Sequence, residues 1–365
     1  MKRHEPAGPE RTVRPDASAT RWTDCLPDWG TTRPQRDPWI VGFLHGEGIG
    51  PEVVDAALEV LAAVGAETGL RFDVRDGGDV GTPSRTGGGL SENVAEFCHG
   101  VFANGGALLC GPVGGRFVYD LRARFDLFCK LVPLRPHPAL TDTAIIRPDL
   151  LDGVDVLLVR ENIAGLYFGE FGRHSGGRVA YQNLSYSAEQ VARIIAVAVD
   201  LARTRRGHLT VVVKRGGIPE VSALWAEQAA IAARGRDVAI EVLEVDNAGF
   251  QLVANPRAFD VVVASNLFGD VLADSATVML GSRGMSYSAN FGPAGRAAYQ
   301  TGHGAAHDLA GADRANPIAQ ILSLATMLRE SFGLPDAARR IEDAISLVLA
   351  AGMRTADVAG SAHQV

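Results

Sequence analysis

Residues 259–276 read FDVVVASNLFGDVLADSA, an apolar run followed by a stretch in which two carboxylates recur. The first part, Phe259–Ser265, is short and rich in valine, which is typical of a strand buried on both faces. If a helix begins near Gly269, Asp270 and Asp274 lie on one face of it, about 5–6 Å apart at Cβ. A helix cap explains only the first carboxylate. Because two like charges at this spacing repel each other, we expect a cation or a cluster of basic groups beside them.

The same change from an apolar strand to a helix recurs along the chain. Further strands are predicted at Trp39–Leu44, Ala107–Gly111, Val154–Arg160, Leu209–Lys214 and Ile240–Asp246. Helices are predicted from Pro51, and at Ala188–Arg203, Ala223–Arg234, Pro317–Phe332 and Ala337–Ala350. Short apolar strands separated by helices predict an α/β protein with a largely parallel sheet.

The overall composition is that of a globular protein of about two domains. The 365 residues are 47% hydrophobic and 21% charged, and their net charge of −7 gives no broad attraction to nucleic acid or anionic lipid. No apolar run approaches the ~20 residues that cross a membrane, and no apolar segment follows the charged N-terminus as in a secretory signal. Four cysteines without CxxC spacing fit a reducing compartment. We therefore expect a cytoplasmic protein without nucleic-acid or membrane partners.

Two features of composition vary along the chain. Residues 1–37 are rich in proline, arginine, aspartate and threonine without apolar periodicity, which predicts a flexible arm that Trp22 and Trp29 could partly fix to a surface. Lysine is scarce, since only three of the 35 basic residues are lysines. Arginine-rich codon usage explains that bias, but not why Lys130 and Lys214 remain in the folded body. Because lysine readily loses its proton or presents a compact ammonium, both are candidates for a chemical role.

Polar side chains follow several of the predicted strands. VRENIAGLYFGE (159–170) places a basic residue, a carboxylate and a tyrosine after one strand, and Lys214 and Asp246 end two others. Open α/β sheets bind ligands at the carboxyl ends of their strands. A structural salt bridge explains the first segment equally well, and an exposed strand end explains Lys214. The three aspartates at 246, 270 and 274, with no cysteine or histidine nearby, favour Mg²⁺ or Mn²⁺ over zinc.

Two glycine-rich segments are candidates for contact with a nucleotide. HGEGIGPEV (45–53) lies at a strand-to-helix turn but lacks the full GxGxxG pattern, so a tight turn is the simpler interpretation. GHGAAHDLAGADRANP (302–317) permits the close approach of a dinucleotide, and Asp308 can accept a hydrogen bond from a ribose hydroxyl. His303 and His307 are poorly spaced for zinc, and a loop without a role accounts for them as well.

Together and in this order, these segments resemble the isocitrate and isopropylmalate dehydrogenase family of β-decarboxylating dehydrogenases, and most of all its NAD-using isopropylmalate members. The motifs span roughly residues 39–350 and are GEGIGPEV, Leu121–Arg122, RENIAGLYFG, Lys214, Asp246, NLFGDVLADSA and HGAAHDLAG…ANPIAQILS. The resemblance implies two α/β domains flanking a cleft rather than the common Rossmann fold. Residues 38–127 and 281–365 would form the cofactor-side domain, and residues 128–280 a central domain with the dimer interface and the metal ligands.

The resemblance also implies a reaction. NAD would take a hydride from a 2-hydroxy acid that bears a carboxylate on C3, and the product would lose CO₂. Asp270 and Asp274 would bind Mg²⁺ or Mn²⁺ together with Asp246 from the partner subunit of a homodimer. Lys214, also from the partner, would take the hydroxyl proton, and Tyr167 would protonate the enolate.

Substrate and cofactor contacts follow from the same resemblance. Arg122 and Arg160 would bind substrate carboxylates. The cofactor would lie against the side chains or backbone of His303, Gly304, Asp308 and Asn316. An aspartate at position 308 favours NAD over NADP, because it bonds a ribose 2′-hydroxyl and repels a 2′-phosphate.

The sequence departs from the family pattern where a second substrate arginine is usual. The segment that ends Asn-Leu-Arg-Pro in the family reads Lys130-Leu131-Val132-Pro133 here. In an extended segment Lys130 and Val132 face the same way, so Lys130 can replace the missing charge from a different position. The C3 substituent would contact Phe117, Val118 and Tyr119, which are bulky and unlike the polar residues expected for a third carboxylate.

These departures predict a 3-substituted malate of non-standard shape as the small-molecule substrate, in a biosynthetic pathway. The alternative within the family is 3-isopropylmalate itself. A different alternative is a non-catalytic subunit that binds the same ligands and regulates a partner. Such a subunit is expected to lack the tyrosine, the lysine or a metal aspartate, and all of these are present here.

Overall fold

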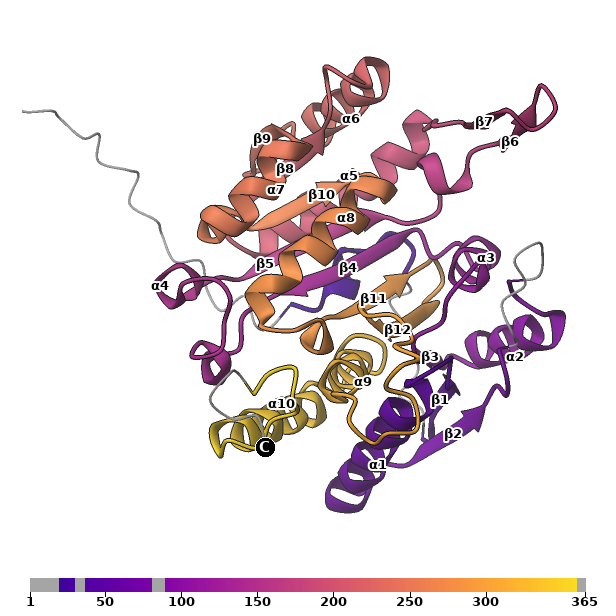
Figure 1. The fold of residues 1–365 in the computed structure, drawn as a ribbon, viewed down its shortest axis with the longest axis vertical. Helices are drawn as coiled ribbons and strands as arrows, with labels where there is room; N and C mark the ends of the chain where they lie inside the picture. Colours follow the sequence, from indigo (N-terminus) through magenta and orange to yellow (C-terminus); the bar gives the residue numbers. More distant parts are fainter. Residues whose placement is uncertain (1–19, 30–36, 81–88, 360–365) are drawn as a thin grey trace, which may run out of the picture.

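The computed structural model describes residues 20–29, 37–80 and 89–359, which fold into an α/β protein (Figure 1). The described residues form one large sheet of ten strands. In sheet order these are β2 (Phe72–Asp76), β1 (Trp39–Leu44), β3 (Ala107–Cys110), β12 (Ala297–Thr301), β11 (Tyr287–Phe291), β4 (Cys129–Leu134), β5 (Val156–Glu161), β10 (Val261–Ala264), β8 (His208–Val213) and β9 (Ala239–Glu244). The six sequence-predicted strands are all present, with ends that shift by one or two residues.

Helices cover this sheet and connect its strands. They are α1 (Gly50–Thr68), α2 (Glu92–Ala103), α3 (Phe117–Arg124), α4 (Pro148–Leu151), α5 (Ala188–Thr204), α6 (Pro219–Ala232), α7 (Val245–Ala254), α8 (Asn266–Ala276), α9 (Ile318–Glu330) and α10 (Pro335–Ala350). Helix α6 begins four residues before the predicted start at Ala223, because Pro219 occupies the first turn, where a missing N–H costs nothing. No helix in the described ranges is long and apolar enough to cross a membrane.

The sheet consists of two parallel halves joined by antiparallel strands. Strands β2, β1, β3 and β12 run parallel, as do β5, β10, β8 and β9. Between these halves, β11 is antiparallel to both β12 and β4, and β4 is antiparallel to β5. The prediction of a largely parallel sheet is confirmed for the halves, and the antiparallel centre is a feature that the apolar runs did not reveal.

The boundary between the two segments predicted as domains falls between β11 and β4. The strands on one side come from residues 38–127 and 281–365, and those on the other side from residues 128–280. One continuous sheet crosses this boundary, so the division into two domains stays a prediction. A separate hairpin of β6 (Phe171–His174) and β7 (Val179–Gln182) extends from the second segment (Figure 1).

Helix α8 forms where residues 259–276 change from strand to helix. Its buried side includes Gly269, Leu272 and Ala276, so Asp270 and Asp274 lie away from the main core. Gly269 is required by close packing, since a Cβ there would lie 2.8 Å from Cγ of Arg160. The predicted helix carrying both aspartates is therefore confirmed, with its start at Asn266.

Residues 20–29, the part of the expected arm that carries Trp22 and Trp29, pack against the folded body. Thr23 is 1% exposed, and its backbone N–H donates to the Glu330 carboxyl of α9 at 3.2 Å. Trp29 packs edge-on against Phe291, with ring centroids 5.3 Å apart. Trp22 and Trp29 thus bury apolar surface against the folded core. Residues 1–19 and 30–36 of the expected arm lie outside the described residues.

Candidate active site

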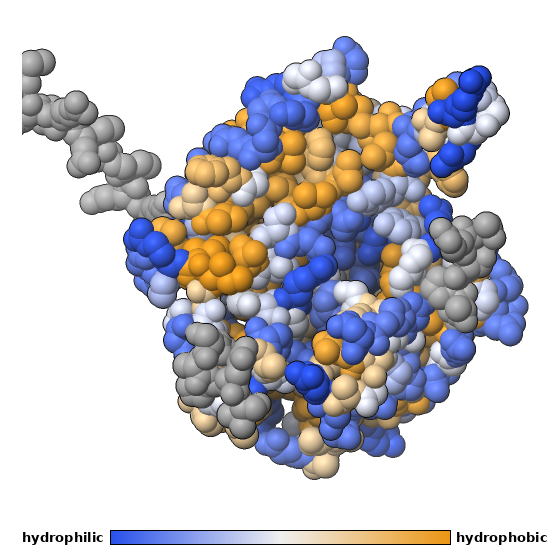
Figure 2. All heavy atoms as spheres, viewed as in Figure 1, coloured by the Kyte–Doolittle hydropathy of each residue, from blue (hydrophilic) through white to orange (hydrophobic). Residues whose placement is uncertain are grey.

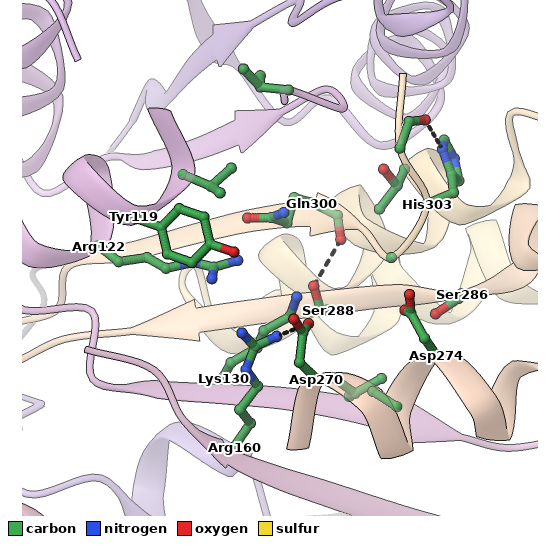
Figure 3. A pocket seen from close by; sticks show the side chains of 17 residues that line it. Tyr119, Arg122, Lys130, Arg160, Asp270, Asp274, Ser286, Ser288, Gln300 and His303 are labelled. Atoms are coloured by element: carbon green, nitrogen blue, oxygen red, sulfur yellow. Dashed lines mark hydrogen bonds and ion pairs between the residues drawn. The ribbon is translucent and has the colours of Figure 1, made fainter. Parts of the chain in front are cut away.

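A cavity of about 200 Å³ opens where β5 and β10 end and where β11 and β12 cross the middle of the sheet (Figure 3). The space-filling view shows a hydrophilic hollow in the centre of this face (Figure 2). Its wall carries three basic side chains, from Arg122, Lys130 and Arg160, and two carboxylates, from Asp270 and Asp274. The cluster of bases expected beside the two aspartates is therefore present.

Arg160 is the most tightly held of the three cations. It is the penultimate residue of β5 and is 2% exposed, and its Nε and Nη2 donate to Oδ1 of Asn266 at 3.0 and 2.7 Å. Its Nη1 donates to Oδ1 of Asp270. Asn266 is fixed in turn, because its Nδ2 donates to the carbonyl of Ala164 at 3.2 Å. The Arg160 guanidinium is thus compensated within the chain.

Asp270 also binds the candidate acid, Tyr167. The Tyr167 hydroxyl donates to Oδ2 of Asp270 at 2.9 Å. Burial tends to raise the pKa of the Asp270 carboxyl, but the Arg160 charge and the Tyr167 hydrogen bond outweigh it and lower that pKa. Burial and the nearby Asp270 charge raise the pKa of Tyr167, so its phenol keeps its proton. This pair holds an ionised carboxylate beside a protonated acid.

Arg122 and Lys130 differ from Arg160, because neither forms an ion pair with a carboxylate in the described ranges. Arg122, on α3, is 5% exposed, and its buried Nε has no hydrogen-bond partner. Lys130, on β4, is 8% exposed and makes no hydrogen bond or ion pair to any described residue. Burial and the charges of Arg122 and Arg160 lower the pKa of Lys130 well below its usual value. Two buried basic side chains without an ion-pair partner among the described residues favour an anionic ligand, which would stabilise their protonated forms.

The predicted substituent contacts lie only partly at the cavity. Val118 and Tyr119 line it, whereas Phe117, the first residue of α3, is 3% exposed, packs in the core and does not line the cavity. The Tyr119 ring meets the Tyr167 ring edge-on, with centroids 5.4 Å apart. Val132 lines the cavity on the same side of β4 as Lys130, as strand alternation predicts.

Asp246 and Lys214 lie outside this cavity. The Lys214 ammonium donates to Oδ1 of Asp246 at 2.5 Å, and both side chains are exposed to solvent. The hydrogen bond to Asp246 raises the pKa of Lys214, so within a single chain this lysine stays protonated and is not poised to take a proton. Asp274 is half exposed and pairs with Arg283 at 2.7 Å. Within the described part of one chain, no three histidine, cysteine or carboxylate side chains gather as a metal site.

The predicted cofactor residues divide into two groups. His303 and Gly304 line the cavity, and burial lowers the pKa of His303, which favours the neutral ring. Its Nε2 is buried without a partner, while its Nδ1 lies 3.0 Å from the Gly304 carbonyl. Asp308 is exposed and does not line the cavity. Asn316 is 6% exposed, and its side chain is engaged by Asp357 at 3.1 Å and by the backbone N–H of Ile318 at 3.0 Å.

The two glycine-rich segments meet beside the cavity. The backbone N–H of Ile49 donates to the carbonyl of Ala305 at 2.9 Å. Gly48 has a φ of +58°, and a Cβ there would lie 2.0 Å from the same carbonyl oxygen. The tight-turn interpretation of HGEGIGPEV therefore fits, and this turn supports the loop that bears His303 and Gly304.

A polar wall formed by β11 and β12 was missed from the sequence. It contributes the side chains of Ser286, Ser288, Gln300 and Thr301 to the cavity. Their polar residues alternate with buried Ala289 and Tyr299, which is the period-two signal of a strand with one polar face. The alternation was present in the sequence. It was overlooked because glycine and proline flank both strand segments and neither segment contains an apolar run.

Comparisons with known proteins agree on one family. The sequence matches the isocitrate/isopropylmalate dehydrogenase family over residues 40–365. The chain is 38% identical to the 3-isopropylmalate dehydrogenase of Gloeobacter violaceus over 344 residues, covering 89% of this chain and 94% of that protein. It is 40% identical to that of Halalkalibacterium halodurans over 343 residues, covering 87% and 92%. The solved structure of isocitrate dehydrogenase from Methylococcus capsulatus superposes with a TM-score of 0.77 at 31% identity, covering 88% of this chain and 94% of that one.

Proposed function

The chain belongs to the isocitrate/isopropylmalate dehydrogenase family of NAD-dependent decarboxylating dehydrogenases, and we propose that its cavity performs metal-dependent oxidative decarboxylation of a 3-substituted malate. One observation carries this proposal most strongly. Arg122 and Lys130 are buried, uncompensated cations beside the Tyr167–Asp270 pair. Basic side chains without protein partners can bind the two carboxylates of a dicarboxylate substrate. A decarboxylation that ends in an enolate also needs an acid close to that substrate to protonate the enolate.

Substrate binding would neutralise the two free cations. Malate carries two carboxylates, and a guanidinium and an ammonium without protein anions provide one charge for each. Bringing these carboxylates to Arg122 and Lys130 gives each basic side chain an anionic partner. Binding energy of this kind orients C2 and C3 of the substrate toward Tyr167, which retains its proton for the enolate carbon.

The donor set fits a hard divalent cation. Asp270 is ionised, Asp274 lies one turn further along α8, and both line the cavity. Mg²⁺ or Mn²⁺ held by these carboxylates and by Asp246 of the partner subunit would stabilise negative charge on the C2 oxygen. Because the described residues of one chain supply two carboxylates to the cavity, a third from a second chain is the arrangement we propose.

Exposed apolar side chains support a homodimer with shared active sites. Phe250 is 67% and Val271 54% exposed, and they lie on α7 and α8, the helices that carry Asp246 and the two cavity aspartates. Figure 2 shows a broad hydrophobic surface over these helices. Burying it against a second copy would bring Asp246 and Lys214 of the partner subunit toward the cavity. There Lys214 would leave solvent and take the substrate hydroxyl proton.

The opposite wall of the cavity suits the cofactor. The His303 ring is held neutral, and Gly304 has no side chain that would cover the backbone from the cofactor. The exposed Asp308 is available to a ribose hydroxyl. NAD would supply the hydride acceptor, and the aspartate favours NAD over NADP. A cytoplasmic location belongs to the same proposal, since all four cysteines, which lie in the described ranges, are free thiols.

The shape of the cavity favours a non-standard C3 substituent. Val118, Tyr119 and Val132 present apolar or aromatic surface, and the second cation comes from position 130 rather than 132. A carboxylate held there lies differently from one held by an arginine at position 132. The second candidate is 3-isopropylmalate, because the relatives at 38–40% identity carry that name.

Turnover by the purified protein tests this proposal. NADH formation and CO₂ release would be followed in parallel with Mg²⁺ or Mn²⁺ on malate, tartrate, isocitrate, 3-isopropylmalate and other 3-alkyl and 3-aryl malates. We expect metal-dependent NADH with equal CO₂, and a higher kcat/KM on another 3-substituted malate than on 3-isopropylmalate. A preference for 3-isopropylmalate would reject the non-standard substrate. No turnover on the panel despite NAD binding would favour the regulatory subunit.

The Val132→Arg variant tests the origin of the substrate preference. It restores an arginine at the family position, and we expect its activity toward 3-isopropylmalate to rise. If that activity stays at the wild-type level, Val132 alone does not determine the specificity.

A further inference from the structure

Helix α8 begins without a cap from its own residues, although it carries both cavity aspartates. Ser265, which precedes the helix, makes no side-chain hydrogen bond to the first turn. The side chain of Asn266, the first helical residue, is engaged elsewhere, because its Oδ1 accepts from Arg160 and its Nδ2 donates to Ala164. Asn266 is 0% exposed, so its backbone N–H needs a partner within the protein.

The phenol of Tyr186 is that partner. The backbone N–H of Asn266 donates to the Tyr186 hydroxyl at 3.0 Å, between residues 80 positions apart. An N–H can only donate, so the phenol oxygen accepts this bond and its own proton is left for another acceptor. That acceptor is the Glu161 carboxyl. Burial, the Glu161 charge and this hydrogen bond raise the pKa of Tyr186, so its phenol keeps the proton.

The same carboxyl holds the loop that follows β5. Glu161 is 1% exposed, and it accepts from the backbone N–H groups of Ile163 and Ala164, both at 3.0 Å. The carbonyl of Ala164 accepts in turn from Nδ2 of Asn266 at 3.2 Å. A closed ring of hydrogen bonds therefore joins the start of α8 to this loop, and its members are Tyr186, Glu161, Ala164 and Asn266.

We infer that Tyr186 is a positioning residue for the proposed reaction, whose hydroxyl holds Arg160 and Asp270 in place relative to Tyr167. This inference rests on the proposed function. On one side of the ring, Asn266 accepts from the Arg160 guanidinium, which also binds Asp270. On the other side, the loop continues directly into the 3₁₀ turn that bears Tyr167. One hydroxyl thus connects a proposed substrate arginine and metal ligand with the acid that would protonate the enolate.

The surroundings of Tyr186 hold its hydroxyl from two sides. Its ring packs edge-on against Trp225, which is 1% exposed, with ring centroids 5.5 Å apart. On the loop side lies Gly165, where a Cβ would come within 2.1 Å of the Tyr186 hydroxyl oxygen. Tyr186 does not itself line the cavity. It would therefore act through the residues that it orients, without touching the substrate.

Tyr186→Phe removes the hydroxyl and keeps the ring. We expect kcat on the best substrate of the panel to fall about tenfold, because small errors in the placement of reacting groups are costly. The KM for that substrate should rise about threefold through Arg160. The KM for NAD should stay within about twofold, because its proposed contacts lie on the opposite wall. Calorimetric titration with malate in Mg²⁺ should show about threefold weaker binding, which is a readout without turnover.

Tyr299→Phe is the matched control. It also deletes one phenol oxygen, which lies 2.8 Å from Oγ of Ser331, and Tyr299 is 0% exposed and does not line the cavity. Both variants should lower the melting temperature by about 2 °C, since each removes a hydrogen-bonded hydroxyl from the protein interior. We expect kcat and malate affinity to fall in Tyr186→Phe alone.

A second pair of variants disturbs the hydroxyl from the loop side. Gly165→Ala brings a methyl group against the Tyr186 oxygen at a φ of +74°. Gly153→Ala adds comparable backbone strain at a φ of +69°, where the new Cβ would meet no described residue beyond its chain neighbours. Gly165→Ala should reproduce the loss of kcat and of malate affinity, and Gly153→Ala should retain both.

Wild-type kcat and malate affinity in Tyr186→Phe, with the same loss of melting temperature as in Tyr299→Phe, would overturn the inference. Tyr186 would then be a structural residue only. A rise in the KM for NAD alone would also overturn it. A wild type that neither binds malate nor turns over the panel would instead contradict the proposed function, and the inference with it. The wild-type measurement therefore distinguishes the two failures.

Discussion

The two ends of the same parallel strands carry buried charges in opposite states. At the amino ends, Asp155 precedes β5, Asp260 precedes β10 and Arg205 lies before β8. At the carboxyl ends lie Arg160 of β5 and, beside it on β4, Lys130. Both clusters contain basic and acidic side chains with little exposure, so burial alone does not distinguish them.

At the amino ends every charge has an opposite partner. Asp260 is 1% exposed and accepts from Nε of Arg205 and from the backbone N–H of Arg206, both at 2.9 Å. Arg205 also donates to Asp155 at 3.0 Å, and Asp155 accepts from Arg135 at 2.7 Å. Burial tends to raise the pKa of Asp155, but the charges of Arg205 and Arg135 outweigh it and lower that pKa. This cluster stabilises the fold and needs no ligand.

At the carboxyl ends the balance is incomplete. Arg160 is paired with Asp270, whereas Arg122 and Lys130 form no ion pair with any carboxylate that the structure describes. A buried charge without a partner costs stability, and a ligand that supplies the partner recovers that cost as binding energy. The comparison teaches that compensation, rather than burial, separates a structural charge cluster from a binding site.

The largest effect is expected from Asp270→Asn at the carboxyl ends. The variant removes a proposed metal ligand and the anion beside Tyr167, so metal-dependent NADH formation should fall about 1000-fold. Asn266 still accepts from Arg160, and we expect a native circular dichroism spectrum and cooperative unfolding. Activity equal to the wild type would reject the metal assignment.

Asp260→Asn makes the same chemical change at the amino ends and should have the opposite signature. It leaves Arg205 with one carboxylate fewer in a buried site, which should lower the free energy of unfolding by about 3 kcal/mol. The kcat of the folded protein should match the wild type, because no atom of this cluster lines the cavity. Urea unfolding and steady-state kinetics measure the two quantities. A loss of kcat at normal stability would contradict the comparison.

Lys130→Met tests whether the buried Lys130 lowers the free energy of unfolding of the ligand-free protein. The substitution removes an uncompensated ammonium and keeps an unbranched side chain of similar length, so the ligand-free protein should gain about 1 kcal/mol of stability. The substrate KM should rise more than tenfold, since one of two carboxylate partners is lost. A variant that is less stable than the wild type would show that Lys130 has a compensating partner.

The smallest effect is expected in the pH dependence of the free energy of unfolding, compared between the wild type and Lys130→Met. The pKa of Lys130 is lower in the folded state than its usual 10.5. At pH values between the lowered pKa and 10.5, the unfolded chain therefore binds more protons than the folded chain. The free energy of unfolding of the wild type should therefore rise relative to Lys130→Met as the pH increases toward about 10.5. Parallel urea titrations from pH 7 to about 10 measure this difference. Parallel curves for both proteins would refute the lowered pKa.

The sequence alone predicted the strands whose cores are uniformly apolar, and with them the positions of Arg160, Asp270 and Asp274. Valine-rich runs and strand ends are local signals, and Asp270 and Asp274 follow from helical spacing. Gln300 was missed because its short strand is half polar. That Lys130 and Arg122 line the same cavity depends on the tertiary placement of α3 relative to β4, which no local pattern encodes.

Lys214 shows a different limit of prediction. Its position after β8 was evident from the sequence, yet one chain leaves it exposed and bound to Asp246. Its proposed environment includes a second chain, whose surface is not determined by the local sequence of the first. The same holds for Asp246, the proposed third metal ligand.

Subunit complementation tests most directly the central claim, that the carboxyl ends of strands from two chains form one active site. Asp246→Asn and Asp270→Asn would be co-expressed with different tags, and the mixed dimer would be purified through both. Each homodimer should be inactive. The mixed dimer should recover about half of the wild-type NADH formation, because one of its two sites then contains both substitutions and the other contains neither. A mixed dimer as inactive as its parents would place both aspartates in the same chain's site and contradict the account.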